Sequence, residues 1–157
     1  MGVEIERKFL VDHEKWTALN KPEPDYFIQG YLLSDAAKTI RIRATNEKGF
    51  ITIKGKSSAD GLARSEFEYE IPKAEAQELL FAFTDKTLEK NRYEILFEGN
   101  VWEVDVFEGD NAGLIVAEIE LESEGQSFTK PDWVTEEVTG ELKYFNSFLI
   151  DKPFKSW

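Results

Sequence analysis

The feature that most constrains the fold of this chain is an alternation of apolar and charged side chains with a period of two. The opening stretch GVEIERKFLV places Glu4, Glu6 and Lys8 on one side of an extended segment and apolar residues on the other. The same alternation returns over 26–33, 38–45, 50–56, 64–71, 87–97, 101–107 and 114–122. This period is typical of β-strands with one apolar face. About eight strands with mostly short connections favour an antiparallel sheet, which can close into a barrel.

Helices and loops are expected where the alternation stops. Segment 12–20 favours a short connecting helix, and Pro72 fits the first turn of a second helix that continues to about residue 83. The stretch SSADGLA over 57–63 is typical of a loop, and a last helix is expected near 141–149. No linker, repeat or low-complexity block interrupts the chain. We therefore expect a single domain over 1–157, mainly β in an α+β class.

Length and composition exclude several classes of protein. The 157 residues include no Cys and a single histidine, His13, which rules out thiolate and multi-histidine metal sites. No apolar run approaches the roughly 20 residues that cross a bilayer, and the N-terminus lacks a signal-peptide core. The net charge of −12 repels nucleic acid and anionic lipid. We expect a soluble, cytoplasmic protein with no nucleic-acid or membrane partner.

The charged sides of the strands allow two arrangements. In an ordinary half-buried sheet they face solvent, where cross-strand charge pairs are worth under about 1 kcal/mol each. The alternation alone favours this arrangement. In the other arrangement the apolar faces pack outward against helices and the charged faces line a water-filled barrel interior. Burying both signs of charge together reduces the desolvation cost, provided that each charge finds a partner or a ligand.

If the charged faces converge, their residue types fit one kind of ligand. Residues two apart on a strand lie roughly 6.5–7 Å apart on one face, so Glu4 and Glu6 form a carboxylate pair. Glu118 and Glu120 form a second pair in the same way. Such hard oxygen donors suit Mg²⁺ or Mn²⁺ and not zinc. A cationic wall beside a divalent metal calls for a compact polyanion, most obviously a chain of phosphates. The wall would consist of Lys8, Arg41, Arg43, Lys54, Lys90 and Arg92.

These segments together resemble the triphosphate tunnel metalloenzyme family, also called the CYTH domain family. Its defining motif, E-x-E-x-K near the N-terminus, matches Glu4 to Lys8. Further blocks follow in family order: QGYL (29–32), IRIR (40–43), TIKG (52–55), EFEYEI (66–71), KNRY (90–93), WEVDVFEG (102–109), AEIELE (117–122) and EVTGELKYFNSFL (137–149). The resemblance implies a closed eight-stranded antiparallel β-barrel with a charged central tunnel and a few helices packed outside.

The resemblance also implies roles for the residues that match these blocks. The ligands of one or two Mg²⁺ or Mn²⁺ ions would be Glu4, Glu6, Glu118 and Glu120. The triphosphate contacts would be Lys8, Arg41, Arg43, Lys54, Lys90, Arg92 and, near the C-terminal helix, Lys143. The supporting tunnel acids would be Glu66, Glu68 and Asp105. Within these sets Lys8, Lys90 and Glu6 are the predicted catalytic residues, with the lysines binding phosphate or orienting water.

The predicted function is metal-dependent hydrolysis of a triphosphate. The chain is short and has no insertion able to build an adenine or thiamine pocket, so inorganic tripolyphosphate is the expected substrate. A class IV-type adenylate cyclase and a nucleoside or thiamine triphosphatase are the alternatives within the family. A non-catalytic polyphosphate-binding module is the alternative of another class, although intact acid pairs weaken anion binding unless a cation intervenes. An outward apolar strip on one of the strands would support a homodimer.

Overall fold

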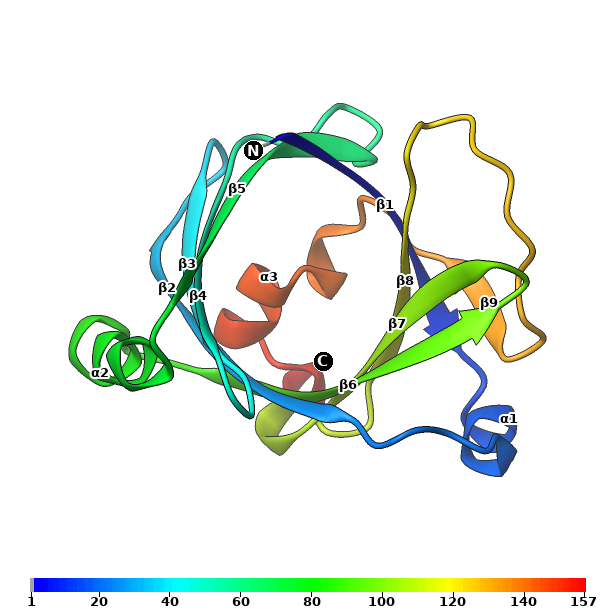
Figure 1. The fold of residues 1–157 in the computed structure, drawn as a ribbon, viewed down its shortest axis with the longest axis horizontal. Helices are drawn as coiled ribbons and strands as arrows, with labels where there is room; N and C mark the ends of the chain where they lie inside the picture. Colours follow the sequence, from blue (N-terminus) through cyan, green and yellow to red (C-terminus); the bar gives the residue numbers. More distant parts are fainter. Residues whose placement is uncertain (1) are drawn as a thin grey trace.

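The computed structural model describes residues 2–157, whose strands close into a barrel (Figure 1). The strands are β1 (Gly2–Val11), β2 (Asp25–Ser34), β3 (Thr39–Ala44), β4 (Gly49–Lys54), β5 (Ala63–Ile71), β6 (Leu88–Phe97), β7 (Asn100–Phe107), β8 (Ile115–Glu120) and β9 (Val134–Glu137). The helices are α1 (His13–Ala18), α2 (Lys73–Phe83) and α3 (Asn146–Asp151), with short 3₁₀ turns η1 (Gly109–Asn111), η2 (Leu142–Tyr144) and η3 (Phe154–Ser156).

Strand β1 closes the barrel because it pairs with both ends of the sheet. The strand order is β5-β4-β3-β2-β6-β7-β8-β1-β9, and β5 pairs in addition with β1. Residues 2–5 of β1 pair antiparallel with β5, and residues 6–10 pair antiparallel with β8. Eight strands therefore form the closed antiparallel barrel that the alternation predicted. In this circular order β3 lies opposite β8, and β2 lies opposite β1.

The ninth strand, β9, lies outside the segments in which the alternation predicts strands. It pairs with β1 at Phe9 and Val11, across an irregularity in the register. Its four residues, VTEE, form a segment too short to display a period-two pattern, so the alternation does not predict this strand. β9 lies outside the barrel, beside the end of β1.

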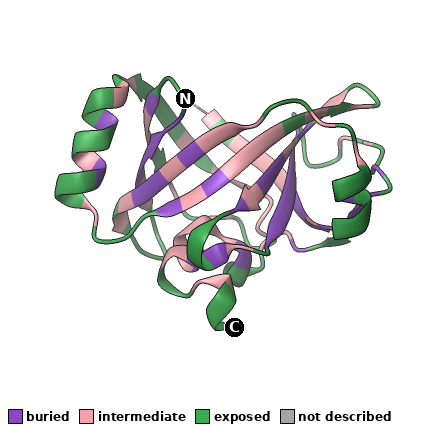
Figure 2. Ribbon diagram, turned by 90° about the horizontal axis from the view of Figure 1, so that it is seen from below, coloured by how far each residue is buried: buried purple, intermediate pink, exposed green. Residues whose placement is uncertain are grey.

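The apolar faces of the strands point outward, so the core surrounds the barrel instead of filling it. The largest apolar cluster includes Phe9, Trp102, Val104 and Ile119 of the strands, together with Trp16 of α1. Trp133 and Phe128 cover the same cluster from the long connection after β8. Figure 2 shows buried positions along the barrel strands and exposed outer faces on the helices. The predicted inverted polarity is thus present.

α2 completes the outer packing, whereas α3 lies over one end of the barrel, inside the ring of strands in the view of Figure 1. α2 places Ala76 and Leu80 on Ile42 and Ala44 of β3. α3 and the turn before it place Leu149 and Tyr144 in a third cluster with Leu88, Phe107 and Val116. None of the helices within residues 2–157 is long and apolar enough to cross a membrane.

The helices depart slightly from their expected bounds. Pro72 is the N-cap of α2, with an extended backbone, and not its first helical residue. The helix expected at 141–149 is divided: η2 ends at Tyr144, Phe145 is extended, and α3 begins at Asn146. This break turns residues 145–147 toward the barrel interior, where they line its cavity. Helical spacing alone does not reveal such a break.

Candidate active site

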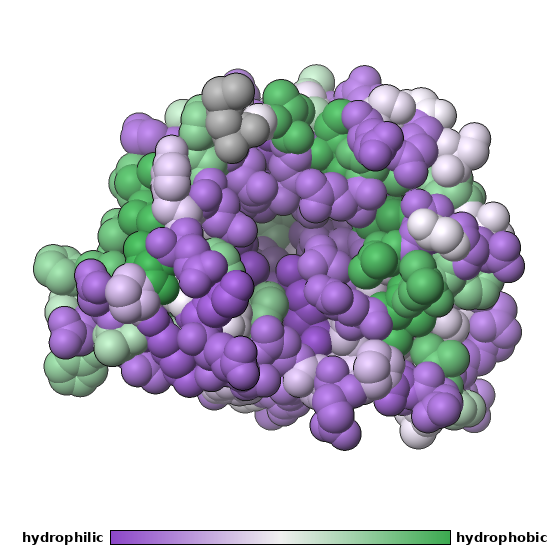
Figure 3. All heavy atoms as spheres, viewed as in Figure 1, coloured by the Kyte–Doolittle hydropathy of each residue, from purple (hydrophilic) through white to green (hydrophobic). Residues whose placement is uncertain are grey.

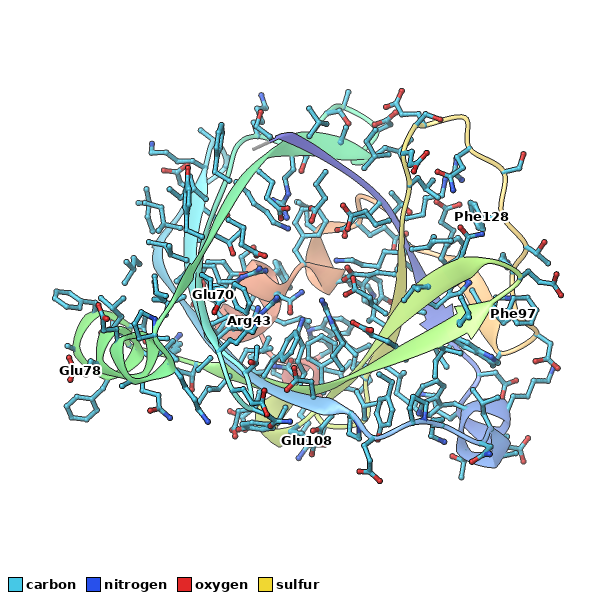
Figure 4. All side chains as sticks on the ribbon, in the orientation of Figure 1. Arg43, Glu70, Glu78, Phe97, Glu108 and Phe128 are labelled. Carbon is cyan, nitrogen blue, oxygen red and sulfur yellow. The ribbon has the colours of Figure 1, made fainter. Side chains whose placement is uncertain are left out.

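The barrel encloses one large charged cavity of about 580 Å³. Every barrel strand except β7 contributes at least two of its lining side chains, and β7 contributes Glu103. Figure 3 shows hydrophilic side chains gathered around the hollow centre, and Figure 4 shows Arg43 pointing into the barrel while Glu78 and Phe128 lie outside. The charged face of the alternation therefore lines the interior, and the arrangement with solvated charges on an open sheet is excluded.

Strand register determines which charges meet in the cavity. Glu6 lies opposite Glu120 and Lys8 lies opposite Glu118 in the β1–β8 pair. On the far wall Arg41 lies opposite Thr52, and Arg43 lies opposite Gln29. The acids of β8 therefore face the bases of β3 across the interior, and the acids of β1 and the bases of β6 line the same cavity. We call Glu4, Glu6, Glu118 and Glu120 the acidic cluster, and Arg41, Arg43, Lys90 and Arg92 the cationic cluster.

Glu6 is the least compensated member of the acidic cluster. Burial raises the pKa of Glu6 well above its ordinary value, and the nearby carboxylates of Glu118 and Glu4 raise it further. Burial also raises the pKa of Glu120, with Glu4 adding to the effect. Carboxylates crowded in this way lack a nearby cation of sufficient charge.

Two lysines neutralise part of the acidic cluster. Lys54 Nζ lies 2.8 Å from Glu4 Oε1 and 3.4 Å from Glu66 Oε2. Burial opposes ionisation of Glu4, but Lys54 outweighs it and leaves the pKa of Glu4 below its ordinary value. Lys8 Nζ lies 3.7 Å from Glu118 Oε1. Burial opposes ionisation of Glu118 as well, yet Lys8 and the more distant bases lower the pKa of Glu118 to about 2.

Two members of the cationic cluster, Lys90 and Arg92, share the buried carboxylate of Asp105. Lys90 Nζ lies 2.7 Å from Asp105 Oδ2, and Arg92 grips the same carboxylate through Nε and Nη2 at 2.8 and 2.9 Å. Arg92 Nη1 donates to Glu103 Oε2 at 3.1 Å. Burial opposes ionisation of Asp105, but these two bases hold its pKa well below the ordinary value. Asp105 is therefore the ionised anchor of this wall.

The bases of this wall are compensated very unequally. Despite its burial, Arg92 has a pKa raised by Asp105 and Glu103, so its charge is already neutralised. Burial lowers the pKa of Arg43 to about 9, and Arg41 and Arg92 add repulsion. Burial lowers the pKa of Lys90 to about 7 despite the opposing attraction of Asp105, and repulsion from Arg92 and Arg43 contributes to the lowering. A bound anion would therefore gain the most electrostatic energy beside Arg43 and Lys90.

The start of α3 lies against the same cavity. Phe145, Asn146 and Ser147 are part of its lining. Lys8 Nζ donates to the carbonyl of Tyr144 at 3.3 Å, and Lys90 Nζ donates to Asn146 Oδ1 at 2.9 Å. The Phe145 ring lies under the Lys8 ammonium, 5.1 Å from its centroid. The C-terminal segment therefore contacts both sides of the site.

The acidic cluster has the chemistry of a divalent-metal site. Within residues 2–157 no three Asp, Glu, His or Cys side chains are gathered closely enough to coordinate an ion as they stand. The donor set is nonetheless four carboxylates on two neighbouring strands, and the pKa values of Glu6 and Glu120 are raised by burial and by the neighbouring carboxylates. Hard oxygen donors in this state fit a hard cation such as Mg²⁺ or Mn²⁺.

The structure brings nearly all the predicted site residues into one place. The cavity lining includes both carboxylate pairs, the six predicted bases of the strands, Glu66 and Glu68. Asp105 lies behind the wall as a partner of Lys90 and Arg92. Lys143 lies elsewhere: it is exposed, and its ammonium stacks over the rings of Tyr144 and Trp157. The basic position before the last helix is therefore not a cavity residue in this chain.

Four further residues belong to the site and were not singled out from the sequence. Arg64 lines the cavity with its Nε 3.9 Å from Glu4 Oε1, and Glu103 lines it opposite Glu118. Their alternation with predicted site residues was a usable signal. Gln29 and Asn146 are neutral, and no charge pattern distinguishes them from ordinary polar residues.

Comparison with known proteins identifies the family. The CYTH domain model matches residues 2–150. An inorganic triphosphatase of Acetivibrio thermocellus is 47% identical over 158 aligned residues, which cover 100% of this chain and 99% of the relative. An inorganic triphosphatase of Nitrosomonas europaea is 35% identical, covering 93% of this chain and 95% of its own. A crystal structure of an inorganic triphosphatase superposes with a TM-score of 0.63 at 33% identity, covering 94% and 93% of the two chains. The chain thus belongs to the CYTH domain family.

Proposed function

We propose that this protein hydrolyses inorganic tripolyphosphate to diphosphate and phosphate with the help of Mg²⁺ or Mn²⁺. The observation that carries the proposal is the pair of opposed clusters in one cavity. A carboxylate set on β1 and β8 shares the cavity with bases on β3 and β6, of which Arg43 and Lys90 are undercompensated. A triphosphate chelated to a divalent cation matches both walls at once. The two relatives named as inorganic triphosphatases support this substrate.

The acidic cluster would hold the metal. Its members Glu4, Glu6, Glu118 and Glu120 would bind one or two ions, and Glu66 and Glu68 would support the nearby bases. When bound, the ion neutralises phosphate oxygens and lowers the pKa of bound water. Glu6 would need to be ionised for this role, and a cation beside it reverses the repulsion that raises its pKa.

The bases would position the phosphate chain. Arg43 and Lys90 hold charge that no carboxylate fully offsets, so a phosphate group there gains the most electrostatic energy. Lys8 and Lys54 lie beside the acidic cluster, where they can contact phosphate oxygens next to the metal. Lys8 and Lys90 would also orient the attacking water. Holding reactants in line supplies much of the rate enhancement in phosphoryl transfer.

A panel of substrates tests the proposal. Phosphate release would be measured with tripolyphosphate, ATP and thiamine triphosphate, each with Mg²⁺, with Mn²⁺ and with chelator. We expect tripolyphosphate with metal to turn over fastest, and Glu118→Gln to abolish release. Cyclic AMP from ATP without phosphate from tripolyphosphate would establish a cyclase instead. Metal-independent binding without turnover would establish a polyphosphate-binding module.

The remaining properties are proposed on general grounds. A net charge of −12 opposes binding to nucleic acid and to anionic membranes, and it supports a cytoplasmic enzyme acting on a small molecule. The family match over residues 2–150 supports a single domain. Exposed apolar side chains on the outer face of β4 and β5, Ile53, Phe67 and Tyr69, would support a homodimer. Sedimentation would decide the last point.

A further inference from the structure

A chain of hydrogen bonds through two amides, the buried Gln29 and the half-buried Asn146, joins Arg43 to Lys90. Arg43 Nε donates to Gln29 Oε1 at 3.0 Å, and Gln29 Nε2 donates to Asn146 Oδ1 at 3.3 Å. Asn146 Oδ1 also accepts from Lys90 Nζ at 2.9 Å. Gln29 is completely buried, and its two amide atoms have only these partners among residues 2–157.

The donors at both ends fix the direction of this chain. An arginine Nε–H can only donate, so the oxygen of Gln29 must face Arg43 and its NH₂ must face Asn146. The ammonium of Lys90 can also only donate, so Asn146 must present its oxygen to both neighbours. Only one orientation of each amide satisfies every contact. Arg43 is consequently held in position by a neutral group alone, whereas Lys90 is held by the neutral Asn146 together with the carboxylate of Asp105.

Neutral partners matter because a carboxylate would cancel the positive charge. Arg92 shows the contrast. Three of its nitrogens donate to Asp105 and Glu103, and these carboxylates neutralise its charge within the protein. Arg43 makes none of the ion pairs found among residues 2–157, and only its Nε is bonded to protein. Its two terminal nitrogens are left for a ligand. The Phe27 ring, 4.4 Å from the guanidinium carbon, supports the flat group from one side.

We propose that Gln29 and Asn146 are positioning residues, which orient Arg43 and Lys90 toward the phosphate chain without adding negative charge beside them. The inference rests on the proposed triphosphatase function. It adds that two segments, β2 and the start of α3, together determine where the phosphate-binding side chains lie. Asn146 lies 117 residues from Gln29 in sequence, so the aim of both bases depends on the docking of α3.

Two substitutions at Gln29 distinguish its effect on the position of Arg43 from its effect on the charge of the cavity. Gln29→Met keeps the volume and removes both hydrogen bonds, and we expect kcat/KM for tripolyphosphate to fall roughly tenfold to a hundredfold. Gln29→Glu keeps an acceptor for Arg43 but adds a negative charge, and we expect its loss to appear mainly in KM. The matched control is Gln77→Met on the exposed face of α2, which should equal the wild type. Thermal unfolding confirms that each variant is folded.

A double-mutant cycle with Arg43 distinguishes positioning from general stability. If Gln29 acts through Arg43, then Gln29→Met should cost little more in an Arg43→Ala background, because the group that it aims is gone. Full additivity of the two losses would overturn the proposal. So would a Gln29→Met enzyme within twofold of the Gln77→Met control, or a Gln29→Glu enzyme with unchanged KM.

The same double-mutant cycle is measured by ligand binding as well as by turnover. The dissociation constant of tripolyphosphate would be measured by calorimetry in chelator, where no hydrolysis can occur. A wild-type protein that binds but does not hydrolyse tripolyphosphate would refute the proposed function, while the binding cycle still decides the role of Gln29. Equal and additive effects on binding would refute the positioning role even in an active enzyme.

Discussion

Glu6 shows how one residue can oppose folding and still serve the site. Its pKa is raised by burial and by two neighbouring carboxylates, so the folded protein holds this proton more tightly than the unfolded chain does. The Glu6 contribution to stability is therefore complete below the ordinary pKa of 4.5 and is lost as pH rises through the folded-state value. A bound divalent cation would reverse this loss by pairing with the ionised form.

Substituting Glu6 with Gln should therefore stabilise the metal-free protein and remove its response to metal. At pH 8 in chelator we expect Glu6→Gln to unfold at a higher temperature than the wild type. With Mg²⁺ in hundredfold excess over its dissociation constant, the wild type should gain about 2.7 kcal/mol and the variant much less. Thermal unfolding at pH 5 and pH 8 measures both effects. A variant less stable than wild type in chelator at pH 8 would contradict this account of Glu6.

Arg43 is the residue whose loss should most weaken the grip on the phosphate chain. Arg43→Ala removes an undercompensated buried charge, and we expect kcat/KM to fall at least a hundredfold by steady-state phosphate release. Arg43→Lys keeps a positive charge but loses the planar guanidinium that can bind phosphate through two nitrogens, so we expect it to recover only part of the activity. Lys143→Ala is the matched control, because this exposed cation lies outside the cavity lining. A similar loss for Lys143→Ala would place the substrate elsewhere.

At the scale of elements, the fold depends on a close contact between α2 and the barrel. A Cβ atom at Gly49 would lie 2.6 Å from the Cβ of Ala76 and 3.0 Å from the carbonyl of Ile71. Helix and strand are in direct contact there, so neither backbone can move away without opening the cluster around Ile42 and Leu80. The absence of a side chain at Gly49 is what allows the helix to approach.

Gly49→Ala should therefore destabilise the protein without affecting the chemistry of the site. We expect a loss of about 1–3 kcal/mol, the usual cost of overpacking, measured by urea unfolding. The kcat of the folded fraction should be unchanged, because Gly49 faces away from the cavity. Gly125→Ala is the control: a Cβ there meets nothing within 4 Å, and its stability should match the wild type. Equal stabilities for the two variants would mean that α2 adjusts freely.

The elements also show how far the sequence could predict the structure. Eight strands were predictable because each is long enough to display its alternation, and the charged face identified most of the cavity residues. β9 is too short for that signal, and the break at Phe145 depends on contacts with distant strands. Gln29 and Asn146 could not be predicted as site residues, because their importance lies in bonds between β2, β6 and α3. The distinction between Arg43 and Arg92 likewise requires knowing which acids each one reaches.

At the scale of the whole molecule, the barrel keeps two unlike clusters apart. The acids of β1 and β8 repel one another, and so do the bases of β3 and β6. The two clusters line one cavity of about 580 Å³, and among residues 2–157 no ion pair joins a member of one cluster to a member of the other. A metal ion relieves the first repulsion, and a polyanion relieves the second. A complex of metal and polyanion relieves both repulsions at once, and its two components also attract each other.

This arrangement predicts that metal and triphosphate bind cooperatively. In thermal unfolding, Mg²⁺ with imidotriphosphate, which resists hydrolysis, should stabilise the protein by more than the sum of the two ligands added separately. For a chain of this size each added kcal/mol corresponds to roughly 2–4 °C. Arg43→Ala should suppress the shift from the anion and spare the shift from the metal, whereas Glu6→Gln should do the reverse. Simply additive shifts would mean that the two ligands occupy independent sites, and the barrel would then not act as one container for a metal–triphosphate complex.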